Sequence, residues 1–414
     1  MIQRLSTILT LAALLPAAGF AAPQAGPPPE SEAPPEASEP TAPDDASRPR
    51  EVRFGNSAFS FYGFARLDAI YEDSRTDSIQ SPTFVRSEDP SAGPEDEDRL
   101  TLHPRLTRFG FDLTGPVLEP LGGARLAGKL EIDFQNGGRE SRAVPRYRHA
   151  YLSLGWEGST LLAGQTWDLI SPLFPEVNAD TLMWNAGNLG DRRAQVRYTL
   201  RPAGTGLSLA AALGLTGAVD EKDLDGDGVR DGEEAAVPNL QARLAWGRQL
   251  GAGRLEVGAW GHVAREEVTT PVAGETEFES SSAGIDWSVP IGSGLTLRGE
   301  LWSGENLSDF RGGIGQGVNR ARGEEIASRG GWAELGWKPG GRYSLYAGAT
   351  VDDPDDDDLA AGDRAENRTW YLVQRLDFHP ALRLGLDLIH WTTDSIGLDE
   401  GEANRLDLYA VYTF

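Results

Sequence analysis

One stretch of the sequence, DLDGDGVRDGEE at residues 223–234, has the spacing of a calcium-binding loop. Carboxylates at its first, third, fifth, ninth and twelfth positions, with a backbone carbonyl at the seventh, can surround one hard cation with oxygen ligands. Gly228 at the sixth position permits the sharp bend that such a loop needs. We expect bound Ca²⁺ to stabilise a surface loop, and an acidic loop without an ion is the alternative. The predicted ligands are Asp223, Asp225, Asp227, Val229, Asp231 and Glu234.

Residue patterns that could support catalysis are missing from the sequence. The chain has no cysteine, which excludes thiol catalysis, thiolate metal sites and disulfides. Its five histidines lack metal-binding spacing, and no nucleophile-elbow motif is present. The run GARLAGK at residues 123–129 has the look of a phosphate-binding loop, but Leu130 stands where a hydroxyl group is needed. We therefore do not expect an enzyme.

The charge of the chain limits its partners. The net charge of −25 argues against nucleic acid, because a phosphate backbone requires a concentrated positive surface. Only Lys129, Lys222 and Lys338 are lysines, and apart from the histidines every other basic side chain is arginine. Arginine binds carboxylate or phosphate groups through a planar fork of donors, so the arginine positions are the ones to locate.

The N-terminal residues have the features of a cleaved signal peptide. A basic start is followed by a mostly apolar run and then by small residues, which predicts residues 1–21 as the signal peptide, with cleavage after Ala21. Residues 22–52 are rich in Pro, Glu, Ala and Ser and almost lack large apolar side chains, which predicts a disordered periplasmic tail. This tail is a plain spacer or, alternatively, a docking segment. The folded domain is expected at residues 59–414.

That domain has no run of eighteen apolar residues, so no transmembrane helix is expected. Instead, apolar and polar residues alternate with a period of two, which is typical of strands with two different faces. The fifty glycines also favour strands and turns over helices. The alternation is clearest at the C-terminus, where one face carries Leu406, Leu408, Ala410, Tyr412 and Phe414.

Sixteen segments fit this pattern, and most reach the nine to eleven residues that a tilted membrane strand needs. Every second connection between them is short, and the others are mostly long and polar. This alternation is the topology of an outer-membrane barrel with short periplasmic turns and long outward loops. The sequence thus predicts an all-β fold, a transmembrane antiparallel β-barrel of sixteen strands. The segments are 59–71, 99–116, 124–136, 146–157, 159–167, 193–201, 206–217, 238–249, 254–265, 276–289, 294–303, 330–338, 342–351, 368–378, 381–392 and 403–414.

The connection at residues 168–192, after the fifth predicted strand, is much less charged than the other long loops. Since an apolar loop is unfavourable in water, we expect it to fold into the lumen and narrow the pore, as in general porins of sixteen strands. Its apolar side chains would pack on the inner wall and its acidic ones would lie at the rim. The alternative is an external loop that packs on a neighbouring subunit. The predicted constriction residues are Phe174, Glu176, Asp180, Trp184 and Asp191.

If the apolar faces of the strands contact lipid, the alternate faces line the lumen. Arg193 and Arg197 would then lie opposite the constricting loop. Arginines at the narrowest point favour anions and carboxylates favour cations, so their balance decides selectivity. For any one arginine, a salt bridge along the wall is the alternative. The predicted pore-lining residues are Arg66, Asp68, Arg105, Arg108, Arg125, Lys129, Glu131, Asp133, Arg193 and Arg197.

Several segments between residues 59 and 201, namely RLTRFGFDL, KLEIDF, RYRHAYLSLG, LLAGQTWDLISPLFP and GNLGDRRAQVRYT, resemble the corresponding run of the DcaP-like porins. These are trimeric outer-membrane channels implicated in the uptake of small, negatively charged organic acids. The resemblance implies a homotrimer in outer-membrane lipid, passive diffusion of small hydrophilic solutes and some preference for anions. The Pro/Glu tail and the strong acidity of this chain depart from the family. A surface-binding, adhesive barrel with calcium-stabilised acidic loops is the alternative function.

Overall fold

The structure is a computed structural model, and the residues it describes are 50–92, 98–135, 143–177, 182–251 and 253–414. The chain divides into two units, residues 1–33 and 34–414, and all of the described residues belong to the second unit. The predicted signal peptide and residues 22–49 of the predicted tail therefore lie outside the described residues. Within the described ranges, no helix is long and apolar enough to cross a membrane.

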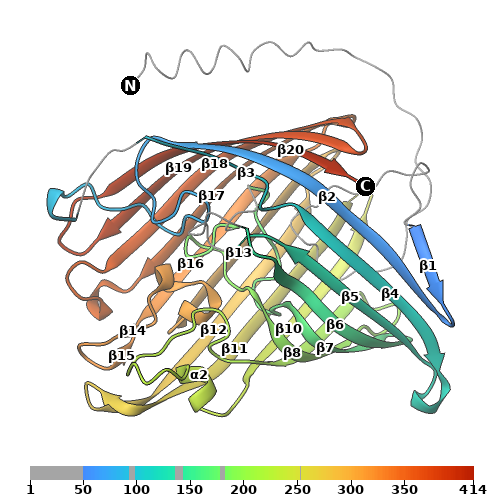
Figure 1. Ribbon diagram of the computed structural model, residues 1–414, viewed down its shortest axis with the longest axis horizontal. Coiled ribbons are helices and arrows are strands. Elements are labelled where there is room, and N and C mark those ends of the chain that lie inside the picture. The colour runs from blue at the N-terminus through green and yellow to red at the C-terminus, as the bar shows by residue number, and fades with distance from the viewer. Residues whose placement is uncertain (1–49, 93–97, 136–142, 178–181, 252) are drawn as a thin grey trace. The chain divides into compact units, whose positions relative to one another are not determined.

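Eighteen of the described strands form one antiparallel sheet that closes on itself, because β20 pairs with β2 (Figure 1), and β14 (Val318–Asn319) pairs with β15 (Glu324–Glu325) in a separate two-stranded sheet. The ring has sixteen positions, since β3 and β4 together make one position and β1 lies outside the ring. The predicted barrel of sixteen strands is confirmed, and each predicted segment overlaps one position. In ring order the strands are β2 (Ser57–Glu72), β3 (Arg99–His103) with β4 (Arg108–Leu118), β5 (Ala124–Asp133), β6 (Arg146–Trp156), β7 (Ser159–Trp167), β8 (Arg192–Leu200), β9 (Leu207–Gly214), β10 (Asn239–Leu250), β11 (Gly253–Val272), β12 (Glu275–Pro290), β13 (Leu295–Glu305), β16 (Ala327–Trp337), β17 (Tyr343–Pro354), β18 (Arg364–His379), β19 (Leu382–Ser395) and β20 (Gly401–Thr413).

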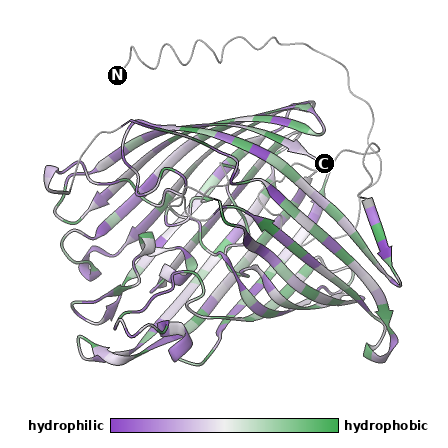
Figure 2. Ribbon diagram, in the orientation of Figure 1, coloured by the Kyte–Doolittle hydropathy of each residue, from purple (hydrophilic) through white to green (hydrophobic). Residues whose placement is uncertain are grey.

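The two faces of the strands differ as the alternation predicts, and Figure 2 shows polar and apolar residues alternating along them. On β20, Arg405 and Asp407 point inward and are buried, whereas Leu408 and Tyr412 are exposed on the outer face. Exposed leucines and tyrosines are costly in water but favourable against hydrocarbon. The outer face is therefore the surface that contacts lipid.

Strand β1 (Arg50–Phe54) corrects the predicted boundary of the N-terminal tail, whose last three residues belong to it. It forms a hairpin with β2, and Gly55 takes the positive φ of 60° that the tight turn requires. β20 pairs with β2 only from Phe64 onward, and β1 pairs with the part before it. The local composition gave no sign of this strand because its stability comes from the free edge of β2.

Part of the barrel interior is an apolar core. Its largest cluster joins wall residues such as Tyr371 and Trp391 to Val85, Met183 and Ala186, which belong to long connections between strands. A second cluster joins Trp260 and Trp302 of the wall to further loop residues. The long connections after β2 and β7, and the one between β13 and β16, therefore contribute to the interior as well as to the outer end.

Candidate functional site

Residues 168–191, here called the inward loop, connect β7 to β8, and all of their described residues are buried. The loop contacts the opposite side of the barrel: the indole nitrogen of Trp302 on β13 donates to the carbonyl of Gly187 at 2.8 Å. On β18, the amide nitrogen of Asn367 donates to the carbonyl of Asn185 at 2.7 Å. Because β13 is five ring positions from β8, the inward loop crosses the interior.

At Gly187 the inward loop touches the wall backbone to backbone. A Cβ atom there would lie 2.4 Å from the carbonyl oxygen of Gly331 and 2.7 Å from that of Val351. Gly187 also has a positive φ of 113°, which residues with a side chain rarely adopt. Glycine is therefore required at this position for the loop to lie flat on β16 and β17.

Glu176 anchors the inward loop to the far wall. Its carboxylate forms ion pairs with Arg298 on β13, at 3.2 Å, and with Arg375 on β18. Its backbone N–H donates to Glu334 on β16 at 2.7 Å. The prediction of Glu176 as a rim group is wrong, because two guanidinium groups of the wall neutralise its charge and cover it.

Arg193 is also a structural anchor rather than a pore-lining residue. Its side chain has no exposed surface, and it bridges Asp168 and Asp309, each at 2.6 Å. Asp309 lies in the connection between β13 and β16, so Arg193 joins two loops. Arg197 is buried as well and donates to Gln195 at 3.0 Å. The alternation places both arginines on the inner face but does not reveal the loops that cover them, so their predicted role is corrected.

The remaining predicted constriction residues have different surroundings. Phe174 and Trp184 pack with Trp167 of β7 in one buried apolar cluster. Asp191 accepts hydrogen bonds from both Nε (3.1 Å) and an Nη (3.0 Å) of Arg311. Burial raises the pKa of Asp191, but Arg311, Arg192 and Arg146 together hold it below its ordinary value. Asp180 lies outside the described residues.

Next to Asp191 the inner wall carries a group of arginines on β4, β6 and β8, which face carboxylates on β5. Glu131 lies 2.6 Å from Arg148 and 3.6 Å from Arg108. Asp133 lies 2.6 Å from Arg146 and 3.3 Å from Arg148. We call Arg108, Arg146, Arg148, Arg192 and Arg311 the arginine cluster. These five arginines face three carboxylates, Glu131, Asp133 and Asp191, so the group has two more positive than negative charges.

Arg146, Arg148, Arg192 and Arg311 were missed in the sequence. The strand pairing of β5 with β6 is shifted by one residue between Glu131 and Ile132. Such a bulge brings two consecutive residues to the same face, so both Arg148 and His149 point inward. Strict alternation counted back from Leu152, which is exposed on the lipid face, places Arg146 and Arg148 on that face too, and only the bulge turns them inward. Arg311 belongs to a loop far away in the sequence, and no pattern in its neighbouring residues predicts that it joins the cluster.

The other predicted pore-lining residues lie on or beside the first strands of the ring. Arg66 and Asp68 form an ion pair at 2.6 Å on β2. Arg105 is buried between β3 and β4. Lys129 is partly exposed on the inner face of β5, and Arg125 is exposed near the short-turn end of the same strand. Alternation therefore places these residues on the inner face, whereas their degree of exposure depends on the loops.

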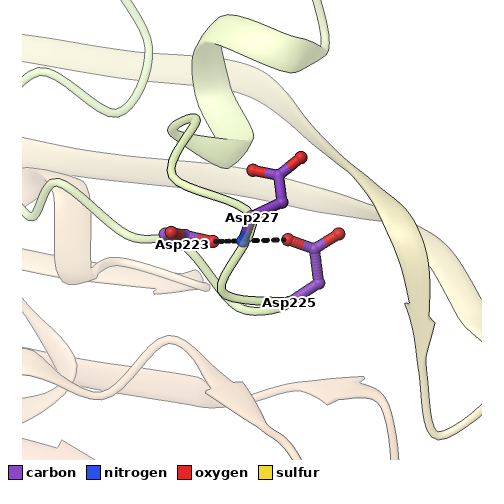
Figure 3. A group of neighbouring side chains, drawn as sticks. All are labelled: Asp223, Asp225 and Asp227. Atoms are coloured by element: carbon purple, nitrogen blue, oxygen red, sulfur yellow. Dashed lines mark hydrogen bonds between the residues drawn. The ribbon is translucent and has the colours of Figure 1, made fainter.

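The predicted calcium loop brings three of its six residues together. The ligand atoms of Asp223, Asp225 and Asp227 lie within 4.8 Å of one another, and Figure 3 shows the backbone N–H of Asp227 donating to the carboxylates of Asp223 and Asp225. Asp231 instead accepts a hydrogen bond from the N–H of Leu224 at 3.0 Å. Glu234 accepts one from Thr269 at 2.7 Å. Val229 is exposed.

A scan against protein families matches residues 44–252, just over half of the chain, to "DcaP outer membrane protein". The chain belongs to the DcaP outer membrane protein family. No curated protein sequence matches this DcaP-family chain. The family and the closed barrel place the protein in the bacterial outer membrane.

Solved structures show the same fold as this DcaP-family chain. The outer membrane channel DcaP of Acinetobacter baumannii is 20% identical with a TM-score of 0.69, over 87% of this chain and 98% of that chain. An anion-selective porin from Comamonas acidovorans is 15% identical with a TM-score of 0.56, over 86% and 100%. In-vitro folded OmpT of Vibrio cholerae in its trimer form is 15% identical with a TM-score of 0.53, over 86% and 99%.

Proposed function

We propose that this chain is a porin through which small hydrophilic solutes diffuse passively, with a preference for small organic anions. The observation that carries this proposal is the arginine cluster on the inner wall. Arg146 and Arg311 keep 33% and 32% of their side-chain surface exposed, so water reaches two of its guanidinium groups. A passage for solutes along this wall would bring them into contact with those charges.

The position of the inward loop supports a passage on the side of β4 to β8. The loop lies against β13 and β16 to β18, where it and the connection between β13 and β16 fill the interior with apolar contacts. On the other side, Asp112 of β4 and Lys129 of β5 are partly exposed inside the barrel. The inward loop would thus narrow the lumen from one side and leave the charged wall as the other.

Anion preference follows from local charge rather than from the charge of the whole chain. Fixed charges at the narrow part of a pore set the energy of a passing ion, and charges more than about 10 Å away are screened at ordinary salt. Much of the acidic excess lies in outer segments such as Asp355–Asp358. The relative described as an anion-selective porin shares the fold and supports the proposal.

The deciding experiment is a measurement of single-channel conductance and reversal potential for the refolded protein in a planar bilayer under a KCl gradient. A reversal potential of the sign given by chloride supports anion preference. The opposite sign would overturn that preference while leaving the pore in place. Absence of conductance from verified folded barrels would contradict the porin proposal and favour a surface-binding barrel.

The proposal includes a homotrimer with one pore in each subunit. A relative of the same fold is described in a trimer form, and the exposed apolar outer face leaves room for contacts between subunits. Sedimentation of the folded protein in detergent tests the subunit number. A trimer would also give conductance steps in groups of three, and a monomeric mass would contradict it.

We further propose that residues 223–234 bind one structural Ca²⁺. Three carboxylates already converge, and Gly228 has the positive φ of 91° that suits the bend at its position in such a loop. Glu234 and Asp231 would have to turn towards the ion to complete the site. Isothermal titration with Ca²⁺ should show one site, which Asp225→Asn weakens and Asp356→Asn, in an acidic run without the spacing, leaves intact. Equal binding by both variants would contradict the site.

A further inference from the structure

A second loop turns into the barrel beside the inward loop. Residues 73–87, here called the strap, follow β2 and can be traced in blue between β2 and β3 (Figure 1). In a long outward connection of a barrel, side chains normally face water. Within this one, every residue from Ser74 to Val85 is buried or only partly exposed. The strap is therefore packed against the protein along most of its length.

The first half of the strap rests on buried charged residues of the wall. Glu72, at the end of β2, has no exposed surface and pairs with Arg99 at 2.6 Å and Arg405 at 2.5 Å. The same two arginines also donate to strap carbonyls: Arg99 to Thr76 at 3.0 Å and Arg405 to Ile79 at 2.7 Å. Glu72 thus positions the two guanidinium groups that hold the strap backbone.

The middle and the end of the strap are attached to different sides of the ring. The amide nitrogen of Gln135, just after β5, donates to the carbonyl of Gln80 at 2.8 Å. The N–H of Val85 donates to the hydroxyl of Thr393 on β19 at 2.9 Å. Between β19 and β5 the ring contains three positions, those of β20, β2 and β3 with β4. The strap therefore bridges these positions at the end where β2 finishes.

Asn367 on β18 joins the strap to the inward loop. Its amide nitrogen donates to the carbonyl of Thr83 in the strap at 2.8 Å and to that of Asn185 in the inward loop at 2.7 Å. Its amide oxygen accepts from Thr393 at 2.8 Å, so the polar atoms of this fully buried side chain are used. Val85 of the strap and Met183 of the inward loop also pack in the same apolar cluster.

We propose that the strap is a second gate at the outer entrance, and that Asn367 and the apolar cluster shared by Val85 and Met183 make the strap and the inward loop open and close together. The inference rests on the proposed pore, since a gate requires a passage. Whether the strap is closed and coupled to the inward loop can be measured in folded barrels that conduct no ions. In the closed state the strap narrows the entrance, and release of the strap widens it.

A substitution in the barrel wall can displace the strap without changing the sequence of the strap itself. Gly401 at the start of β20 lies under the strap, and a Cβ atom there would be 2.3 Å from the carbonyl oxygen of Arg86. Gly401→Val should therefore push the strap away from the wall. Asn367→Ala instead removes the hydrogen bonds that hold the strap and the inward loop to β18. Gly155→Val is the matched control, because a Cβ atom at Gly155 has only one neighbour, at 4.0 Å.

Cysteine reporters make opening visible, because the chain has no native cysteine. Val85→Cys and Met183→Cys place thiols where 1% and 2% of the side chain is exposed, and Ser91→Cys provides an exposed reference. Each is labelled with a charged thiol reagent in folded barrels, whose integrity is checked by migration on gels without heating. We expect positions 85 and 183 to react at least about tenfold more slowly than position 91. Gly401→Val and Asn367→Ala should increase the labelling rate at positions 85 and 183, and Gly155→Val should leave the rate at both positions unchanged.

Three results would overturn the proposal. Rapid labelling at position 85 in the otherwise unchanged barrel means that the strap is not closed. Continued protection in both Gly401→Val and Asn367→Ala means that the strap does not open. Acceleration at position 85 alone means that the loops are not coupled. If labelling behaves as expected but bilayers show no conductance, the coupled loops stand and the pore proposal fails.

Discussion

Arg311 and Asp191 connect two loops that come from opposite sides of the barrel: two nitrogen atoms of the guanidinium group contact one carboxylate oxygen at 3.1 and 3.0 Å. Arg311 belongs to the connection between β13 and β16, and Asp191 ends the inward loop. The contact places a partly exposed guanidinium group beside the rest of the arginine cluster. The charge that we propose for solute selection is therefore assembled from distant parts of the chain.

Replacing Arg146 with Ala should reduce the anion preference, because Arg146 is the most exposed member of the arginine cluster. One charge about 4 Å from a passing ion stabilises an anion and destabilises a cation by about 1 kcal/mol each in water, so the ratio of anion to cation permeability should fall by up to about thirtyfold. Reversal potentials under a KCl gradient measure this change. Arg329→Ala is the control, since that side chain is 78% exposed on the outer face. Equal effects of both variants would place the selective charge elsewhere.

Replacing Arg193 with Ala should destabilise the folded barrel rather than change its selectivity. The change leaves Asp168 and Asp309 buried without their shared partner, a loss of roughly 3–5 kcal/mol. Unfolding in urea, followed by tryptophan fluorescence, gives the free energy of unfolding. The control is Arg254→Ala, which breaks an exposed pair with Glu256 worth at most about 1 kcal/mol. A shift in reversal potential with an unchanged free energy of unfolding would mean that Arg193 lines the pore after all.

Replacing Gly187 with Ala should lower the single-channel conductance. The added Cβ atom would meet the carbonyl of Gly331 at 2.4 Å, and both backbones belong to packed segments. The inward loop must then move off β16, towards the proposed passage. Gly155→Ala serves as control because its Cβ atom meets only ordinary contacts. Conductance equal to that of the unchanged protein would mean that the loop can move without entering the passage.

The ring itself could be predicted because each barrel strand carries its own signal. A lipid face opposite a polar face gives alternation within nine to eleven residues, and turn residues mark the ends. Strand β1 has no such signal, since it exists only by pairing with the edge of β2.

The interior could be predicted only in outline. The low charge of residues 168–192 indicated an inward loop, but its anchors are set by tertiary contacts. Glu176 meets Arg375 across 199 residues of sequence, and Asn367 meets Thr83 across 284. Alternation assigns a side chain to a face and says nothing about which loop covers it. For this reason alternation places Arg193 in the pore lining, whereas it hides Arg146 because the bulge between β5 and β6 shifts that residue to the inner face.

The charge of Asp191 should stay constant between pH 7 and pH 5. Burial raises its pKa, but Arg311, Arg192 and Arg146 together hold it below the ordinary value of 3.8. A carboxylate whose pKa is lowered by folding contributes stability that is fully present above its unfolded pKa and is lost as the pH falls through the lower folded pKa. No loss is therefore expected above pH 5.

This constancy can be measured by comparing the protein with its Asp191→Asn variant. Removing one negative charge beside the arginine cluster should increase the anion preference, and the difference in reversal potential between the two proteins should be the same at pH 7, 6 and 5. Other carboxylates that titrate in this range affect both proteins alike and cancel in the difference. A difference that shrinks towards pH 5 would mean that Asp191 becomes protonated there, so that the three arginines do not hold its pKa down.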